Sequence, residues 1–365
     1  MINVFGSKVG GAELLEVQST IEAQWLGMGK KVAIFEKMMA EHIQTPFVAV
    51  DNCSNALLMA LKILDLPPRS DVIVPTITWL SCANAVIMAG HNPVFADVDY
   101  DTVNMTRETV LKSATDNTKA VMSVHYAGYP CRTGYISIDI PIIADCAHAV
   151  DTKICGEHIA NFADISVFSF DSMKNIAAGE LGGFASPNPE YIEKAKEYRY
   201  CGILKSGLQA SGDKTRWWEY DINMPFIKML PNDICASVAI AQKKNLDSLQ
   251  ARRKAIWDIY NRDLADLSWL TLPLVVEDDI QHSYFTYFVK VAGGKRDMLA
   301  RYLLDNGIYT TVRYQPLLMI PVYKSNAKLP VAERLNEELL NLPLHPNLTD
   351  KELDYVIDKI VSFRI

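Results

Sequence analysis

The chain has 365 residues, of which 49% are hydrophobic and 22% charged, and its net charge at pH 7 is −7. This length predicts one large domain and a smaller one, and no stretch reaches the roughly 18 consecutive apolar residues of a membrane span. Seven cysteines without a CxxC pair argue against a disulfide framework and a metal site, and the lack of a long basic run argues against nucleic acid. Residues 1–11 lack the pattern of a secretory signal, so we expect a cytoplasmic protein.

Short apolar runs alternate with helical patterns through the first two-thirds of the chain. Each run ends at a polar residue or a proline; the runs are 72–74, 94–96, 120–124, 142–144 and 166–168. Strands that are apolar on both faces and separated by helices indicate a mostly parallel sheet in an α/β domain. Such sheets bind ligands beyond the carboxyl ends of their strands, where this chain repeatedly has polar side chains.

A long helical pattern covers residues 233–264, with room for one break. We expect it to connect a large domain, residues 1–245, to a small C-terminal domain, residues 246–365. The last helix should begin with a capping box formed by Thr349 and Glu352. An apolar stripe follows at Leu353, Val356, Ile357, Ile360 and Val361.

Two segments near strand ends are suited to a flat, phosphorylated ligand. Cys53 and Ser54 open a strongly apolar helix, and small residues there expose backbone N–H groups and a hydroxyl to an anion such as phosphate. Trp79 follows the run 72–74, where an indole can stack on a ring. The alternatives are an ordinary capped helix and a tryptophan of the core.

A third candidate is Asp145, which ends the run 142–144, with His148 shortly after it. A carboxylate at the end of a buried strand is costly without a cationic partner. The protonated nitrogen of pyridoxal phosphate (PLP), whose ring acts as an electron sink, would be such a partner. Asp145 could equally be a helix N-cap, and His148 a hydrogen-bonded core histidine.

The segment 168–184 has the richest pattern. An apolar strand leads through Ser169 to a single lysine, Lys174, and then to Gly179 and the pair 182–183. Burial disfavours the ammonium form, and neutral lysine forms Schiff bases with aldehydes; a surface lysine in a turn is the alternative. A phosphate cradle, an aromatic plate, a strand-end aspartate and a glycine-flanked lysine together predict one PLP site.

On these segments the sequence resembles the DegT/StrS-type sugar-nucleotide aminotransferases, which are PLP-dependent enzymes of the aspartate-aminotransferase fold (fold type I). The resemblance is most specific at 145–148 and 168–175. It extends over nearly the whole chain, through 25–27, 32–36, 72–76, 83–86, 93–99, 125–128, 314–317, 330–333 and 342–344. It implies a large domain with a mostly parallel sheet and a smaller C-terminal α/β domain.

The resemblance also implies roles for single residues. Lys174 would bind PLP as a Schiff base and shuttle a proton, Asp145 would pair with the pyridine nitrogen, and His148 would lie near the phenolic oxygen. Trp79 would stack on the ring. The phosphate would be held by Cys53, Ser54 and Ser169, and by Lys228 of the other subunit of a homodimer with shared active sites. Tyr314 would lie at the substrate site, and a donor carboxylate needs a guanidinium, for which Arg199 and Arg313 are both candidates.

The implied reaction transfers an amino group from glutamate to a nucleotide-linked keto-deoxysugar, in the synthesis of amino sugars for surface polysaccharides or glycosides. A 4-keto-6-deoxy sugar is the favoured substrate, and a 3-keto sugar is the second choice. Three departures from the family pattern bear on the substrate pocket: the short segment 129–141, Leu181 in place of glycine, and Pro231 in place of Met or Leu. A PLP-dependent sugar dehydratase would replace Lys174 with histidine. A regulatory protein without turnover would not need both Lys174 and Asp145.

Overall fold

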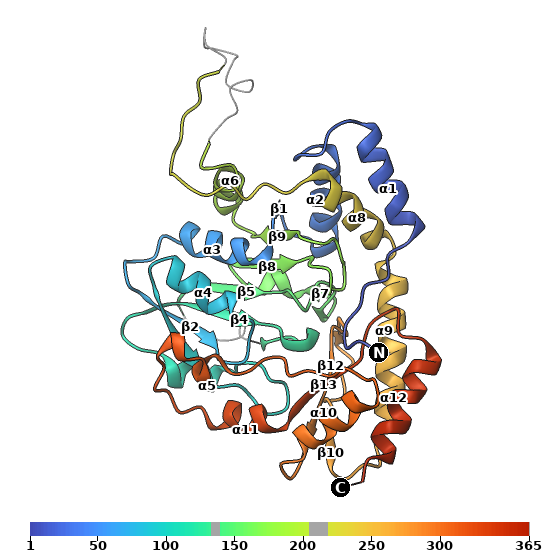
Figure 1. Ribbon diagram of the computed structural model, residues 1–365. Coiled ribbons are helices and arrows are strands. Elements are labelled where there is room, and N and C mark those ends of the chain that lie inside the picture. Colours follow the sequence, from blue (N-terminus) through green and yellow to red (C-terminus); the bar gives the residue numbers. More distant parts are fainter. Residues whose placement is uncertain (133–138, 204–217, 365) are drawn as a thin grey trace.

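The computed structural model describes residues 1–132, 139–203 and 218–364 (Figure 1). A seven-stranded sheet with the order β1-β9-β8-β5-β4-β2-β3 forms its centre. The strands are β1 (Phe47–Val50), β2 (Asp71–Pro75), β3 (Asn92–Ala96), β4 (Thr118–Val124), β5 (Ile142–Asp145), β8 (Ile165–Ser169) and β9 (Gly182–Ala185). Neighbours from β8 to β3 pair in parallel, whereas β9 is antiparallel to both β1 and β8. The prediction of a mostly parallel α/β sheet is confirmed.

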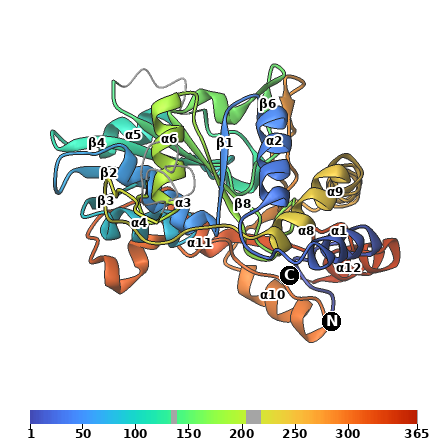
Figure 2. The same ribbon diagram turned by 90° about the horizontal axis from the view of Figure 1, so that it is seen from above.

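Helices cover both faces of this sheet because successive strand residues point to opposite sides. Ile143 belongs to a core cluster with residues of α3 (Cys53–Ile63), α4 (Ser81–Met88) and α6 (Pro189–Tyr198). Its neighbour Ala144 belongs to a second cluster with residues of α2 (Lys30–Ile43) and α8 (Asp233–Lys244). Seen from above, β1 lies between α6 and α2 (Figure 2). Two further α-helices of this part are α1 (Gly11–Glu22) and α5 (Arg107–Ser113).

The predicted long helix is broken once, at Asn245, between α8 and α9 (Leu246–Asp263). Beyond it lies a small sheet of β10 (Leu270–Thr271), β12 (Tyr287–Val291) and β13 (Leu339–Leu342), packed with α10 (Arg296–Asp305), α11 (Pro330–Glu338) and α12 (Asp350–Ser362). The capping box at Thr349 is present and begins α12. The division into domains at residue 245 stays a prediction.

Three short strands, β6 (Lys153–Ile154), β7 (Glu157–His158) and β11 (Ile280–Gln281), form a further sheet. Both chain ends lie beside the C-terminal part (Figure 1), where Ile2 pairs with Ile308. Leu181 is buried in the core, and residues 133–138 of the short segment lie outside the described part. Within the described ranges, no helix is both long and apolar enough to span a membrane.

Candidate active site

A cavity of about 560 Å³ lies at the carboxyl ends of the parallel strands. The end of β5, the loops after β2 and β8, and the N-terminus of α3 form one side, and residues 309–314 of the C-terminal part form the other. Most of the sequence-predicted site residues line it together: Cys53, Ser54, Trp79, Asp145, His148, Ser169, Lys174, Arg313 and Tyr314. The tertiary structure thus gathers segments that are far apart in the sequence.

Lys174 lies in the loop between β8 and β9, and hydrogen bonds fix that loop. Phe170 N donates to the Leu181 carbonyl and Ala178 N donates to the Phe170 carbonyl, each at 2.8 Å. The side-chain amide of the next residue, Asn175, donates to Gln250 Oε1 at 2.7 Å and to a backbone carbonyl at 2.6 Å. The loop is therefore anchored to α9, and the lysine points into the cavity.

Burial, and after it the nearby Arg313 guanidinium, lowers the pKa of Lys174 to about 8, whereas Asp145 opposes the shift. Lys174 Nζ lies 4.7 Å from the centre of the Phe285 ring. A lysine with this pKa is substantially neutral in mildly alkaline solution, and only the neutral amine is a nucleophile. The surface-lysine alternative does not describe this side chain.

Asp145 ends β5 with 6% of its surface exposed. Its carboxylate accepts a hydrogen bond from Ala147 N at 2.9 Å and one from Cys82 Sγ at 3.4 Å. Burial raises its pKa, and within the described residues no cation forms an ion pair with it. The N-cap alternative fails, because β5 is followed by turns and not by a helix.

His148 lies against Phe285, with ring centres 4.0 Å apart and an interplanar angle of 17°. Arg313 Nη1 donates to Tyr314 Oη at 2.9 Å, which is 3.2 Å from His148 Nε2. Burial, with Lys174 and Arg313 nearby, holds the pKa of His148 well below its usual range. The imidazole is therefore neutral at the cavity wall, and its Nδ1 has no partner in the described part of the chain.

The N-terminus of α3 opens onto the cavity. Asn52 caps it by accepting a hydrogen bond from Asn55 N at 2.9 Å, and Ser54 Oγ lies 2.7 Å from Ser81 Oγ. A Cβ at Gly182 would lie 2.3 Å from the Asn52 carbonyl carbon, so glycine lets β9 pass directly behind the helix start. Cys53 and Ser54 at this helix start line the cavity, so the first turn of α3 borders it.

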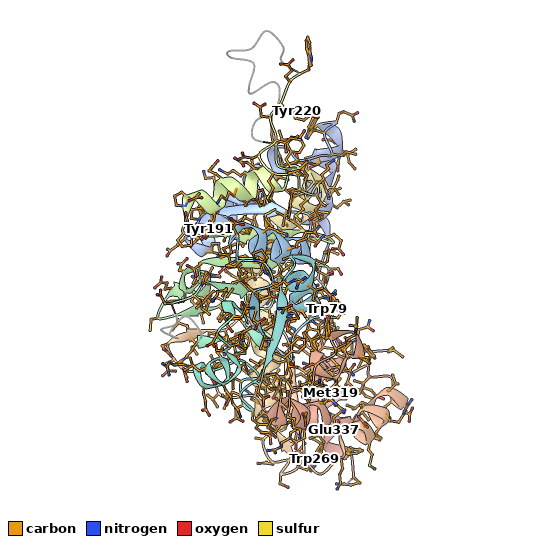
Figure 3. All side chains as sticks on the ribbon, turned by 90° about the vertical axis from the view of Figure 1, so that its left-hand side faces the viewer. Trp79, Tyr191, Tyr220, Trp269, Met319 and Glu337 are labelled. Atoms are coloured by element: carbon orange, nitrogen blue, oxygen red, sulfur yellow. The ribbon has the colours of Figure 1, made fainter. Side chains whose placement is uncertain are left out.

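Trp79 is 53% exposed, which excludes the core-tryptophan alternative. Figure 3 shows Trp79 at the level where the first part of the chain meets the C-terminal part. Its ring centre lies 5.7 Å from that of Tyr314, at an interplanar angle of 52°. The indole face is therefore available to a flat ligand.

The two candidate arginines have different surroundings. The Arg313 guanidinium lines the cavity and contacts Tyr314 Oη and, at 3.7 Å, Met173 Sδ. Arg199 is not brought to the cavity: its Nη1 forms an ion pair with Glu36 at 2.5 Å and donates to a backbone carbonyl. Arg199 is therefore not among the residues that line this chain's own cavity. Lys228 is exposed and does not line the cavity either. It forms an isolated antiparallel β-bridge with Tyr200.

Several residues at the site carry no signal in the sequence. Phe285 stacks on His148, Phe5 lines the cavity, and Cys82 donates to Asp145. None stands at a diagnostic spacing from a predicted residue, and each arrives through a different segment. Only the fold places them there.

The described residues fit PLP. A buried carboxylate without an ion pair suits a pyridinium nitrogen, and an amine of lowered pKa suits an aldehyde. An open helix N-terminus suits a phosphate, and an exposed indole suits an aromatic ring. These four features surround one cavity of about 560 Å³.

Known proteins provide an independent comparison. The sequence profile of the DegT/DnrJ/EryC1/StrS aminotransferase family matches residues 8–361. A dTDP-4-dehydro-2,3,6-trideoxy-D-glucose 4-aminotransferase from Saccharopolyspora spinosa is 33% identical over 368 residues, which cover 98% of this chain and 96% of that protein. The aminotransferase TlmJ from Streptoalloteichus hindustanus has a TM-score of 0.93 at 34% identity, covering 99% of this chain and 98% of its own. The PLP form of Spr1654 from Streptococcus pneumoniae has a TM-score of 0.88 at 28% identity, and the match covers 97% of this chain and 96% of that one.

The profile match leaves only a few residues at each end of the chain uncovered. The structural match extends to both parts of the molecule and includes a protein that binds PLP. This chain therefore belongs to the DegT/DnrJ/EryC1/StrS aminotransferase family and is a PLP-dependent aminotransferase with the aspartate-aminotransferase type of fold.

Proposed function

We propose that the enzyme transfers an amino group from glutamate to a nucleotide-linked keto-deoxysugar, with a 4-keto-6-deoxy sugar first and a 3-keto sugar next. The observation that carries the proposal is one cavity that holds Lys174, the buried Asp145 and the Arg313 guanidinium. The sugar class is supported by the relative from Saccharopolyspora spinosa, whose name states a dTDP-linked 4-dehydro sugar. The sequence resemblance at residues 125–128 and 314–317 supports the same class.

When bound, PLP supplies an aldehyde that accepts amines and a pyridinium ring that stabilises negative charge on the adjoining carbon. Asp145 would keep the ring nitrogen protonated, because its buried carboxylate gains a cationic partner. Trp79 would cover one face of the ring, and neutral His148 would lie near the phenolic oxygen. The phosphate would be bound at the N-terminus of α3 by Cys53 and Ser54, and by Ser169.

Lys174 would hold the cofactor and then move the proton between the carbon and nitrogen of the reacting amine. A general base is most effective when its pKa is near the working pH, and the pKa of Lys174 is about 8.

Arg313 would clamp a carboxylate of glutamate. Within the described residues its guanidinium donates only to Tyr314 and Met173 and has no ion-paired carboxylate, so guanidinium donors remain for a bidentate contact.

The proposal includes a homodimer with shared active sites. Lys228 lies on an exposed segment outside its own cavity, and would complete the phosphate site of the other subunit. The same segment exposes apolar side chains, Tyr220 at 56%, Ile222 at 51% and Ile227 at 50%. Tyr220, labelled in Figure 3, lies at the far end of the molecule from the C-terminal part.

A panel assay tests the substrate class. With glutamate as donor, the enzyme should aminate one or more nucleotide-linked 4-keto or 3-keto deoxysugars, and should turn over pyruvate, oxaloacetate and unlinked sugars far more slowly. Fast turnover of a simple keto acid, with no reaction on any nucleotide sugar, would overturn the sugar assignment alone.

A second experiment tests the cofactor lysine. Borohydride reduction of the PLP-loaded enzyme should attach the cofactor covalently to the peptide that contains Lys174. Attachment to another lysine would refute this assignment. The cofactor's absorbance change with glutamate alone separates an aminotransferase from a protein without turnover.

A further inference from the structure

The first residues of the chain form a strap across the C-terminal part. Ile2 N donates to the Gly307 carbonyl at 2.7 Å, and Tyr309 N donates back to the Ile2 carbonyl at 2.9 Å. Leu344 N donates to the Val4 carbonyl at 3.2 Å. We call residues 2–8 the N-terminal strap; it lies beside the segment that carries Arg313 and Tyr314.

The strap is fixed on both sides of Phe5. Val4 is buried, at 1% exposed. A Cβ at Gly6 would lie 3.0 Å from His345 Nδ1, so the backbone passes directly against that ring. Further on, Gln242 Nε2 donates to the Lys8 carbonyl at 2.8 Å. Between these anchors the half-buried Phe5 side chain lines the cavity.

Phe5 meets the guanidinium of Arg313 face on. The central guanidinium carbon lies 3.6 Å from the centre of the Phe5 ring, and 5.1 Å from the centre of the Phe285 ring. The two rings are nearly parallel, with an interplanar angle of 13° and centres 6.3 Å apart. An arginine stacks in this way while its N–H edge stays available for hydrogen bonds.

Few other contacts restrain this guanidinium. Its hydrogen bonds are to Tyr314 Oη at 2.9 Å and Met173 Sδ at 3.7 Å, and the described residues provide no carboxylate for it. An arginine side chain has several rotatable bonds, and ordering it during binding would weaken affinity. Stacking on a ring that is itself anchored reduces this loss.

We propose that Phe5 is a positioning residue for the amino donor: its ring holds the Arg313 guanidinium in place at the cavity, where a donor carboxylate would bind. This inference rests on the proposed function, in which Arg313 clamps the donor. It gives the N-terminal strap a role in substrate binding besides packing. Phe5 itself touches Arg313 and acts on the donor only through it.

The test measures the donor half-reaction of the PLP-loaded enzyme by stopped-flow absorbance over a range of glutamate concentrations. Phe5→Leu keeps an apolar side chain but removes the ring. It should raise the half-saturating glutamate concentration about 2- to 30-fold, which is the fold-change that the free energy of one cation–π contact corresponds to. The limiting rate should change less than about 2-fold, because the reacting groups are untouched. Phe5→Tyr keeps the ring and should restore the wild-type constant. Asn3→Ala, on the same strap, is the matched control and should have no effect.

Arg313→Gln separates the inference from the function on which it rests. The variant should raise the glutamate constant strongly, and adding Phe5→Leu to it should have no further effect, because the guanidinium is gone. An unchanged constant in Phe5→Leu, with a raised one in Arg313→Gln, would overturn the inference alone. An unchanged constant in Arg313→Gln would overturn the donor clamp itself. A lower melting temperature in Phe5→Leu with an unchanged glutamate constant would show a purely structural strap, and would also overturn the inference.

Discussion

At the residue scale, burial controls the charge of the two central groups. Asp145 and Lys174 are both shifted toward their neutral forms, and in each case desolvation is the largest cause. Each group costs free energy of folding while it is charged in the apoprotein. A cofactor that carries a pyridinium and an aldehyde removes both costs, so the apo site is energetically prepared for PLP.

Asp145→Asn tests this preparation. Burial raises the pKa of Asp145 in the folded protein above its pKa in the unfolded chain. The free energy of unfolding therefore falls as the pH rises from the unfolded-state pKa through the folded-state pKa, and it stays lowered at neutral pH. The amide should therefore leave the apoprotein's melting temperature at pH 7.5 unchanged or higher. The donor half-reaction should slow roughly 10- to 1000-fold, as one to three pKa units of lost charge pairing imply. A half-reaction at the wild-type rate would show that Asp145 does not protonate the ring.

The pKa of Lys174 predicts a pH dependence. The rate at which the apoprotein takes up PLP should rise with pH, pass its midpoint near pH 8 and level off above it, because only the neutral amine reacts. Arg313→Gln should move the midpoint upward, since the guanidinium lowers the pKa of Lys174. Arg313→Lys keeps the charge and is the control. Absorbance-monitored uptake from pH 6.5 to 9.5 measures the midpoint, and equal midpoints in all three proteins would contradict the electrostatic account.

At the element scale, the site depends on how β9 passes the start of α3. Gly182 pairs with Val50 across the sheet, and its missing side chain makes room for the Asn52 backbone. Asn52 in turn caps α3. The strand, the cap and the first turn of α3, which borders the cavity, are thus one packed unit.

Gly182→Ala should damage stability and cofactor affinity together. The added methyl group would lie 2.3 Å from the Asn52 carbonyl carbon, so backbone has to move. Such overpacking costs about 1–3 kcal/mol of the free energy of unfolding, and displacement of the cap should also raise the dissociation constant for PLP. Urea denaturation and PLP titration measure the two effects. Gly27→Ala, where the new Cβ would meet nothing within 4 Å, is the control; equal behaviour of the two variants would refute the packing argument.

At the scale of the whole molecule, the cavity is assembled from both parts of the chain. Lys174 and Asp145 belong to the first part, whereas Arg313 and Tyr314 follow α10 in the second. The N-terminal strap returns to the second part through Ile2 and Gly307. Arg313 and Lys174 therefore move relative to each other if the two parts do.

Complementation tests the shared site. Lys174→Ala and Lys228→Ala homodimers should each be impaired, and mixing the chains under exchange should restore part of the activity. In a mixed dimer, the Lys228→Ala chain contributes an intact Lys174 and its partner contributes an intact Lys228 to the same site. No recovery, with mixed dimers shown by mass spectrometry, would mean that Lys228 acts elsewhere.

The sequence by itself predicted the main parallel strands, the helices of residues 233–264 and the cofactor chemistry. Apolar runs ending at polar residues or a proline identified β2, β3, β4, β5 and β8, because a strand buried on both faces is mostly apolar until it ends. The pattern over 233–264 predicted α8 and α9 with one break. Lys174 and Asp145 could be selected because they occur together with a helix start suited to phosphate and a tryptophan after a strand, a set that together resembles one PLP site.

The tertiary structure alone decided which residues meet across the cavity. The sequence left Arg199 and Arg313 equivalent, and the fold separates them, since Glu36 pairs with Arg199 while Arg313 lines the cavity. Phe5 and Phe285 are 280 residues apart in the sequence, yet they stack beside one guanidinium. Local sequence carries the preferences of single segments, whereas these contacts depend on packing between segments that no local pattern relates.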